Sequence, residues 1–249
     1  MKQFESLLAE HGRAVLCFSA GKDSLACLEM LRPYLDHVTL AWVDAGATHP
    51  QVQAYMDKVR GEVPNFQTIR GNQPQSIETF GWPVDVLPVR KSLAGTYGAG
   101  PAGITFQPYT ECCARSMWKP MSDFLRASGH TLVITGQRRE ESLRNRSRDE
   151  VLQEVGGVTY YQPLNDWSTD QVLEWLDWKG LPLPPFYAEG AESSADCWNC
   201  TAYLDHNQGR LRHMQRTEPE AFQHVAVVLT ELQRQIQAES FPLNQILET

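Results

Sequence analysis

The sequence has no run of apolar residues long enough to cross a membrane, and its start, Met1 to Glu5, lacks the apolar core of a secretory leader. It also has no excess of basic residues, because 22 Lys and Arg stand against 30 Asp and Glu and give a formal net charge of −8. An acidic chain lacks the electrostatic footprint of a protein that binds nucleic acid unaided. We therefore expect a cytoplasmic protein without membrane contact.

Neither a Ser/Gly-rich linker nor a block of like charges divides the 249 residues, so the sequence predicts a single large core. Cysteine is scarce as well: there are six, and none follows Cys200. In a cytoplasmic chain of this size, so few cysteines do not indicate a disulfide framework. They are candidates for metal ligands, reactive thiols or buried apolar residues.

Residues 13–28 run from an apolar segment, through a turn of small residues, into a segment with apolar residues at helical spacing. This order predicts a strand, an anion-binding loop and a helix that begins at Asp23 or Ser24. The free N–H groups of that helix and the charge of Lys22 favour a phosphate. A Walker A loop is excluded, because Leu16 and Asp23 stand where it needs Gly and Ser or Thr. A solvated lysine on an ordinary strand–helix turn is the alternative.

The segment 19–24 resembles the PP-loop, usually SGGKDS, of the ATP pyrophosphatases and of their sulfate-activating and sulfonucleotide-reducing relatives. The resemblance implies that ATP, with magnesium, is cleaved to AMP and pyrophosphate and that a substrate is adenylated. It implies that the phosphates are held by Ser19, Ala20, Gly21, Lys22, Asp23 and Ser24, with Lys22 and Asp23 catalytic. Ala20 stands where glycine is usual, which costs little unless the position needs a positive φ.

Strands and helices alternate along the chain, which predicts an α/β fold with a doubly wound, mainly parallel sheet. The resemblance implies the Rossmann-like fold of the adenine nucleotide α-hydrolases. We expect a nucleotide-binding domain over residues 1–201, which includes the cysteines, and a helical extension over 202–249. An irregular excursion is expected over 71–109. Further strands are expected at 37–43, 66–69 and 131–135, and helices at 2–11, 51–60, 121–127, 208–216 and 219–238, with one more beginning at Ser168 or Thr169.

Asp44 directly follows the strand predicted at 37–43, and open α/β sheets bind ligands beyond the carboxyl ends of their strands. We therefore predict that Asp44 contacts magnesium, ribose or adenine. With Gly46 and Pro50, it resembles the D-T-G-x-x-x-P segment of the sulfonucleotide reductases. We assign no role to His49.

A glycine and several arginines follow the strand predicted at 131–135, and arginine presents a rigid charged fork to phosphate oxygens. The stretch resembles the family motif G-x-R-x-x-E-S, which implies a phosphate-binding role for Arg138 and nucleotide contacts for Gly136 and Glu141. Asn145 stands where the family has a further arginine, so we also take Arg144 as a catalytic candidate. An arginine-rich amphipathic surface helix is the alternative.

Two cysteine pairs lie far apart in the sequence and together could supply four thiolates: Cys112, Cys113, Cys197 and Cys200. Such a set fits tetrahedral zinc or an iron–sulfur cluster, and adjacent cysteines suit the larger cubane better. The combination resembles the iron–sulfur sulfonucleotide reductases and the pyrophosphatases of DNA phosphorothioation, which implies a [4Fe–4S] cluster. Cys17 and Cys27 fall in regular elements and are expected to be apolar core residues.

The reductases use a cysteine beyond the cluster as nucleophile, and none follows Cys200. Lys22 and Asp23 favour ATP as substrate. The resemblance therefore implies an ATP pyrophosphatase for DNA phosphorothioation, with a cysteine desulfurase as sulfur donor and a protein partner that brings the DNA. The alternatives are an adenylyl-sulfate or 3′-phosphoadenylyl-sulfate reductase, and an iron–sulfur scaffold without turnover. The sulfur acceptor and a homo-oligomeric state stay open.

Overall fold

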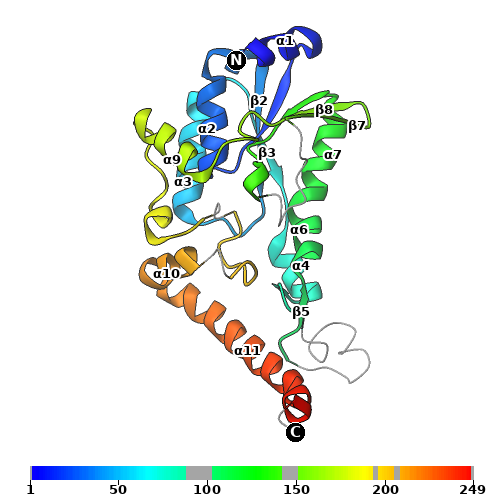
Figure 1. Cartoon of the computed structure of the whole chain (residues 1–249), viewed down its shortest axis with the longest axis vertical. Helices are drawn as coiled ribbons and strands as arrows, with labels where there is room; N and C mark the ends of the chain where they lie inside the picture. Colours follow the sequence, from blue (N-terminus) through cyan, green and yellow to red (C-terminus); the bar gives the residue numbers. More distant parts are fainter. Residues whose placement is uncertain (1, 88–102, 142–150, 193–195, 205–207, 248–249) are drawn as a thin grey trace.

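A central sheet carries helices on both faces (Figure 1). The structure is a computed structural model that describes residues 2–87, 103–141, 151–192, 196–204 and 208–247. Within these residues the sheet has six strands in the order β3-β2-β1-β6-β8-β7, and all neighbours are parallel except β8 and β7. The strands are β1 (Ala14–Cys17), β2 (Val38–Asp44), β3 (Phe66–Arg70), β6 (Leu132–Ile134), β7 (Leu152–Val155) and β8 (Val158–Tyr161). The predicted doubly wound, mainly parallel sheet is confirmed.

Most helices begin and end near the predicted positions, but the last one, predicted over 219–238, continues to Leu247. Figure 1 shows α2, α3 and α9 on one side of the sheet and α7 on the other. Ser168 caps α9 and forms a capping box with Gln171. The elements are α1 (Lys2–His11), α2 (Lys22–Leu31), a 3-10 helix (Arg32–His37), α3 (Pro50–Glu62), α7 (Lys119–Ser128) and α9 (Thr169–Trp178).

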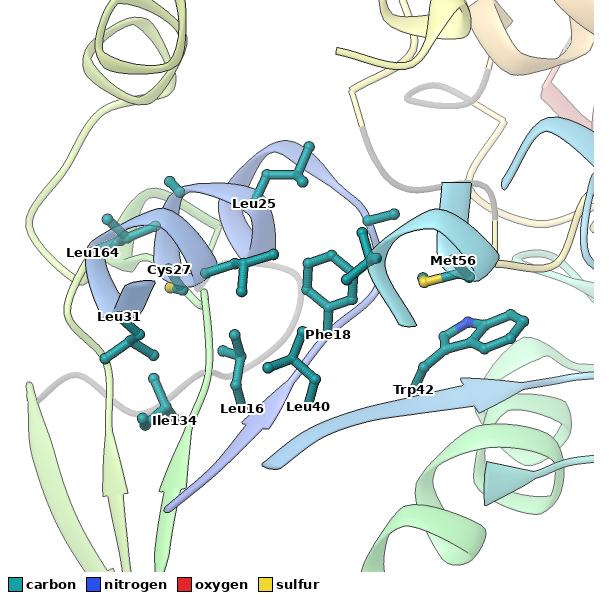
Figure 2. Close-up of a cluster of buried hydrophobic side chains, with 14 of the residues drawn as sticks. Leu16, Phe18, Leu25, Cys27, Leu31, Leu40, Trp42, Met56, Ile134 and Leu164 are labelled. Carbon is teal, nitrogen blue, oxygen red and sulfur yellow. The ribbon is translucent and has the colours of Figure 1, made fainter. Parts of the chain in front are cut away.

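The main core lies between the sheet and α2 (Figure 2). Leu16, Leu40 and Ile134 project from three neighbouring strands and are fully buried. Leu25 and Leu31 meet them from α2, because apolar residues at helical spacing share one face. Each such side chain stabilises the fold by roughly 1.5–3 kcal/mol. This packing fixes α2 on the sheet, and with it the loop that precedes α2.

The expectation of an irregular excursion over residues 71–109 is wrong in part. Asn72 caps α4 (Gln73–Phe80), and β4 (Trp82–Val84) pairs with β5 (Phe106–Pro108) in a small parallel sheet. Strands of three residues are too short to show a period. The rest of this stretch, residues 88–102, lies outside the described residues.

The hairpin of β7 and β8 was not predicted either. Val155 pairs with Val158 across Gly156 and Gly157, whose φ angles are 60° and 78°. A two-residue turn with positive φ at both positions joins antiparallel strands without splaying them. The Gly-Gly pair between β-branched residues was therefore an available signal for the hairpin.

The cysteine-bearing segments and the last helices complete the fold. These are α6 (Tyr109–Cys113), a π-helix (Ala114–Trp118), 3-10 helices (Arg139–Glu141 and Pro185–Glu189), α10 (Gln208–Thr217) and α11 (Pro219–Leu247). Met214 and Val225 join the main core, while Val228 and Leu232 of α11 pack with Val84 and Phe106 in a second cluster. The division at residue 201 stays a prediction. Over the described residues, no helix is long and apolar enough to cross a membrane.

Candidate active site

A cavity of about 680 Å³ opens beyond the carboxyl ends of β1, β2 and β6. The strand order reverses here, because the chain runs outward from β1 to β2 and β3 and then returns to place β6 on the other side of β1. Open α/β sheets bind ligands at such a switch point. The loop of residues 19–24, called the 19–24 loop below, forms one wall, and Met117, Trp118, Met121 and Leu125 form an apolar wall. The cavity therefore has a polar side, at the start of α2, and an apolar side.

Ala20 holds the 19–24 loop in an unusual backbone conformation, with φ at 56°. This is the left-handed region, which costs a residue with a Cβ about 1–2 kcal/mol. The position does need a positive φ, so the condition under which alanine is costly there is met. Glycine, which the resembling loops carry, adopts this angle freely.

The rest of the loop is held by its two serines. The Ser24 hydroxyl donates to the Gly21 carbonyl at 3.0 Å and accepts from the Ser19 N–H at 3.2 Å. Gly21 is the N-cap of α2 and provides no side-chain cap, while the Lys22 N–H donates to the Tyr187 hydroxyl at 3.1 Å. The first turn of α2 thus borders the cavity, in an arrangement that suits an anion.

The Lys22 side chain is only 4% exposed. Its ammonium donates to Asp23 Oδ2 at 2.9 Å and to the Glu192 carbonyl at 3.1 Å. A buried ammonium needs such partners, because its desolvation otherwise costs several kcal/mol. Asp23 lines the cavity, so Lys22 is held beside it rather than on the outer surface.

Arg138, in the segment after β6, contacts the loop through Asp23, and its side chain is 1% exposed. Its Nε donates to Asp23 Oδ1 at 2.8 Å, and its other nitrogens reach Glu140 Oε2 at 2.6 Å and Thr169 Oγ1 at 2.9 Å. Arg138 therefore ties the 19–24 loop to the start of α9. The contact with phosphate that we predicted for Arg138 stays a prediction.

Gly136 explains how the end of β6 comes so close to this loop. A Cβ at position 136 would lie 2.9 Å from the Asp23 carbonyl carbon and 3.0 Å from the Asp23 Cβ. Only glycine fits without a shift of the backbone, and this close packing explains why the motif has glycine at position 136. The structure describes Glu141 in a 3-10 helix without its side chain, and Ser142, Arg144 and Asn145 lie outside the described residues.

Asp44 shapes the loop after β2. Its Oδ1 accepts from the Gly46 N–H at 3.0 Å and the Thr48 hydroxyl at 3.3 Å, and its Oδ2 pairs with Arg70. Asp44 is not among the described lining residues of the cavity, although Trp42 and Val43 before it are. A nucleotide or magnesium contact by Asp44 therefore stays a prediction.

The four cysteines predicted as ligands are brought together from α6 and from a turn between the 3-10 helix Pro185–Glu189 and α10. Burial raises the pKa of Cys113 to about 12, and Cys200 and Cys112 add to the shift. Burial, Cys200 and Asp196 likewise raise the pKa of Cys197 well above its usual value. All four are free thiols, and Cys112 contributes to the raised pKa of the other three. We call Cys112, Cys113, Cys197 and Cys200 the thiol centre.

The donor set of the thiol centre fits a thiophilic metal. Mutual repulsion disfavours several thiolates at one place, and a bound cation removes that penalty. In the described part of the chain, no group of three or more Cys, His, Asp or Glu is already arranged to hold a metal ion. The chemistry of the four side chains thus fits, while their present geometry is not that of a loaded site.

Neighbouring elements fix the C-x-x-C half of the centre. The backbone N–H of Trp198, inside the turn, donates to the Ala47 carbonyl at 2.9 Å, and the indole ring packs on His49 with 3.9 Å between ring centroids. His49 caps α3 by accepting from the Gln51 N–H at 3.2 Å. Burial, with a contribution from His213, lowers the pKa of His49 to about 4, so this ring is neutral at pH 7.

Comparison with known proteins identifies the fold and the family. The model of the phosphoadenosine phosphosulfate reductase domain matches residues 13–203. The chain belongs to that family.

Relatives of this reductase-domain family include a phosphoadenosine 5′-phosphosulfate reductase from Gloeobacter violaceus, 26% identical over 86% of this chain and 86% of that protein. An adenosine 5′-phosphosulfate reductase from Burkholderia cepacia is 25% identical over 75% of this chain and 70% of its own length. The phosphate complex of phosphoadenylyl-sulfate reductase from Candida auris has the same fold, with a TM-score of 0.50 and 16% identity over 72% of this chain and 79% of that one.

The two cysteines outside the thiol centre, Cys17 and Cys27, differ in their exposure. Cys27 is fully buried in α2, as expected. Cys17 is only half-buried and lines the cavity, so the expectation that both thiols are shielded from substrate is wrong for Cys17. Burial raises the pKa of Cys17 to about 12, which keeps it a thiol at pH 7.

Sequence reasoning missed three residues of this site. Trp42 and Thr135 line the cavity. Their buried polar atoms, Trp42 Nε1 and Thr135 Oγ1, have no hydrogen-bond partner among the residues that the structure describes. Thr135 lies just beyond β6 and Trp42 two residues before the end of β2, close to the strand ends where such sheets bind ligands. Arg210 contacts the C-x-x-C turn from α10, where the sequence showed only a helical pattern.

Proposed function

We propose that this member of the family is an ATP pyrophosphatase that activates a substrate for sulfur transfer and holds a [4Fe–4S] cluster at the thiol centre. The observation that carries the proposal is the retained Lys22–Asp23 pair, held beside the switch-point cavity at the first turn of α2. A lysine and a helix terminus at one place suit a pyrophosphate group, which a sulfonucleotide lacks.

Each loop residue has a distinct role in this proposal. Lys22 and the first N–H groups of α2 hold the β- and γ-phosphates, and their charge favours departure of pyrophosphate. Asp23 positions Lys22 and Arg138 through its two oxygens and offers the cavity a carboxylate for magnesium. Trp42, Thr135 and the apolar wall accommodate the adenosine.

The thiol centre adjoins this cavity. The π-helix and α7, which follow Cys112 and Cys113, supply Met117 and Met121 to the apolar wall, and Asp196 precedes Cys197. A cluster bound there supplies a redox-active or sulfur-binding centre at the edge of the nucleotide site. Modification of DNA by phosphorothioation is the finer form of the proposal, with sulfur from a cysteine desulfurase. The net charge of −8 favours a protein partner that brings the DNA.

A sulfonucleotide reductase is the second candidate, favoured by the named relatives and by Cys17 in the cavity wall. In such a reaction a cysteine thiolate attacks sulfur and releases the adenine nucleotide. With its pKa at about 12, the Cys17 thiolate is scarce at neutral pH. This chain's own thiols therefore support the reductase less well than the loop supports ATP cleavage.

Anaerobically purified protein, incubated with magnesium and each nucleotide in turn, tests the proposal. We expect AMP and pyrophosphate from ATP, and no sulfite from adenylyl sulfate or its 3′-phosphorylated form with thioredoxin or glutathione. Sulfite that disappears in Cys17→Ser or Cys27→Ser would establish the reductase instead. ADP as the product would exclude a pyrophosphatase, and nucleotide binding without any turnover would establish a scaffold.

A further inference from the structure

Arg210 closes over the C-x-x-C turn from the first turn of α10. Its guanidinium donates to the Trp198 carbonyl and the Cys200 carbonyl, both at 2.6 Å, and to the Cys197 carbonyl. The side chain is 1% exposed. Three carbonyls of one four-residue turn thus accept hydrogen bonds from one planar guanidinium.

Gly209 brings this part of α10 close enough for that contact. A Cβ at position 209 would lie 2.1 Å from the Ala191 nitrogen and 2.2 Å from the Gly190 carbonyl carbon. Such distances are impossible without moving the backbone, so glycine is required for the approach. Gly209 therefore allows the close approach, and Arg210 next to it places its guanidinium at the thiol centre.

Arg210 is a buried cation whose hydrogen-bond acceptors are neutral. Among the residues described, no carboxylate lies within ion-pair distance of it, and its buried Nε has no hydrogen-bond partner. Leaving a buried charge uncompensated costs several kcal/mol. The turn that it holds carries the thiols of Cys197 and Cys200, which become thiolates when a metal binds, so the negative charge that Arg210 faces is that of a loaded centre.

The other charges near the centre have the opposite sign. Asp196 and Asp85 add to the raised pKa of Cys113, and Asp196 also adds to that of Cys197. Arg210 opposes them by acting to lower the pKa of Cys200. A loaded centre would be anionic, because four thiolates outweigh the charge of a cubane core or of zinc. The fixed positive charge of Arg210 therefore complements the loaded state.

We propose that Arg210 is the positioning residue and counter-charge of the thiol centre, which holds the Cys197–Cys200 turn in place and raises the reduction potential of the bound cluster. The inference rests on the proposed function in that the centre binds a metal through its thiolates. A nearby cation stabilises the state with one more electron, since that state is the more negative one.

Redox titration of the anaerobically purified full chain, followed by electron paramagnetic resonance, tests the inference. At the wild-type midpoint potential, Arg210→Gln and Arg210→Met should lower the ratio of reduced to oxidised cluster at least tenfold, which is about 59 mV for a one-electron couple. Arg210→Lys keeps the charge and should stay within about threefold. Arg212→Gln, an exposed arginine on the same helix, is the matched control and should change nothing.

The metal content of the three variants also tests the role of Arg210 as counter-charge. If the neutral variants lose the metal while Arg210→Lys keeps it, the counter-charge role is supported. If all three variants lose it alike, shift the potential alike or leave it unchanged, the role as counter-charge is refuted. Protein that contains zinc instead of iron contradicts the proposed cluster and the effect on its potential, but not the role of Arg210 as counter-charge of the thiol centre. Zinc release to a chelator should then be at least tenfold faster in the neutral variants than in Arg210→Lys, and equal rates would refute it.

Discussion

The 19–24 loop and the thiol centre are built in opposite ways. The loop is six consecutive residues that follow β1 and run into the first turn of α2, and local hydrogen bonds of its two serines hold it, although Lys22 and Asp23 also contact Tyr187, Glu192 and Arg138. The thiol centre joins two pairs 84 residues apart (197 − 113) and depends on α10 for Arg210. A local motif can be recognised from its residues alone, whereas the surroundings of a composite site emerge only when distant segments pack.

The two regions also treat charge differently. At the loop, Lys22, Asp23 and Arg138 form a paired network, so the site is balanced before a ligand binds. At the thiol centre, burial and neighbouring groups that include Asp196 raise the pKa values of Cys113 and Cys197, while Arg210 and a hydrogen bond from the Ala202 backbone act in the opposite direction at Cys200. The loop is thus preorganised, while the thiol centre needs a metal to become stable in its ionised form.

The largest effect should follow removal of a ligand. Cys197→Ser should abolish the brown colour and the iron and sulfide content, because a [4Fe–4S] cluster needs all four thiolates. Iron and sulfide analysis of anaerobic protein measures this. Cys17→Ser is the control and should keep the metal, since Cys17 lies at the cavity instead. Stoichiometric zinc in colourless, fully active protein would contradict the cluster.

The loop is tested next by Lys22→Ala. Loss of one charge-assisted phosphate contact costs on the order of 1.5–3 kcal/mol, so pyrophosphate release should slow at least tenfold. Lys58→Ala removes an exposed lysine that pairs with Glu62 and should leave the rate unchanged. Iron content should be normal in both variants, because the two regions are predicted to be independent. A full rate with Lys22→Ala would exclude Lys22 from phosphate binding.

Gly136→Ala tests the contact between β6 and the loop. The new methyl group would press on the Asp23 backbone at 2.9 Å, so we expect a loss of about 1–3 kcal/mol in unfolding free energy and slower turnover. Gly61→Ala is the matched control in α3, where a Cβ meets nothing within 4 Å and alanine favours the helix. Denaturant unfolding measures both, and equal stabilities would contradict the close approach.

Ala20→Gly should give the smallest effect and the opposite sign. Glycine relieves the left-handed conformation at φ 56°, so unfolding free energy should rise by about 1 kcal/mol or less, after the entropy cost of glycine. Ala26→Gly, inside α2, should instead lose about 1 kcal/mol or more. Thermal unfolding compares the two. Destabilisation by Ala20→Gly would mean that the alanine is not strained.

The sequence by itself determined the parallel α/β fold, because apolar periodicity and helix signals such as Ser168 are local and unambiguous. It also singled out the loop and the four cysteines as candidates, since the chemistry of Lys22 and of paired cysteines shows in residue type and spacing. Short elements such as β4, β5 and the β7–β8 hairpin escaped prediction, as three or four residues carry little periodic signal.

Tertiary structure alone decided the surroundings of both sites. Asp44 and Arg138 looked like ligand contacts in the sequence, yet the fold engages Asp44 with the loop after β2 and with Arg70, and Arg138 with Asp23. Arg210 showed no signal, because its role depends on packing across a turn ten residues away. Burial and the approach of distant charges set what these side chains do, and neither is encoded at one position in the chain.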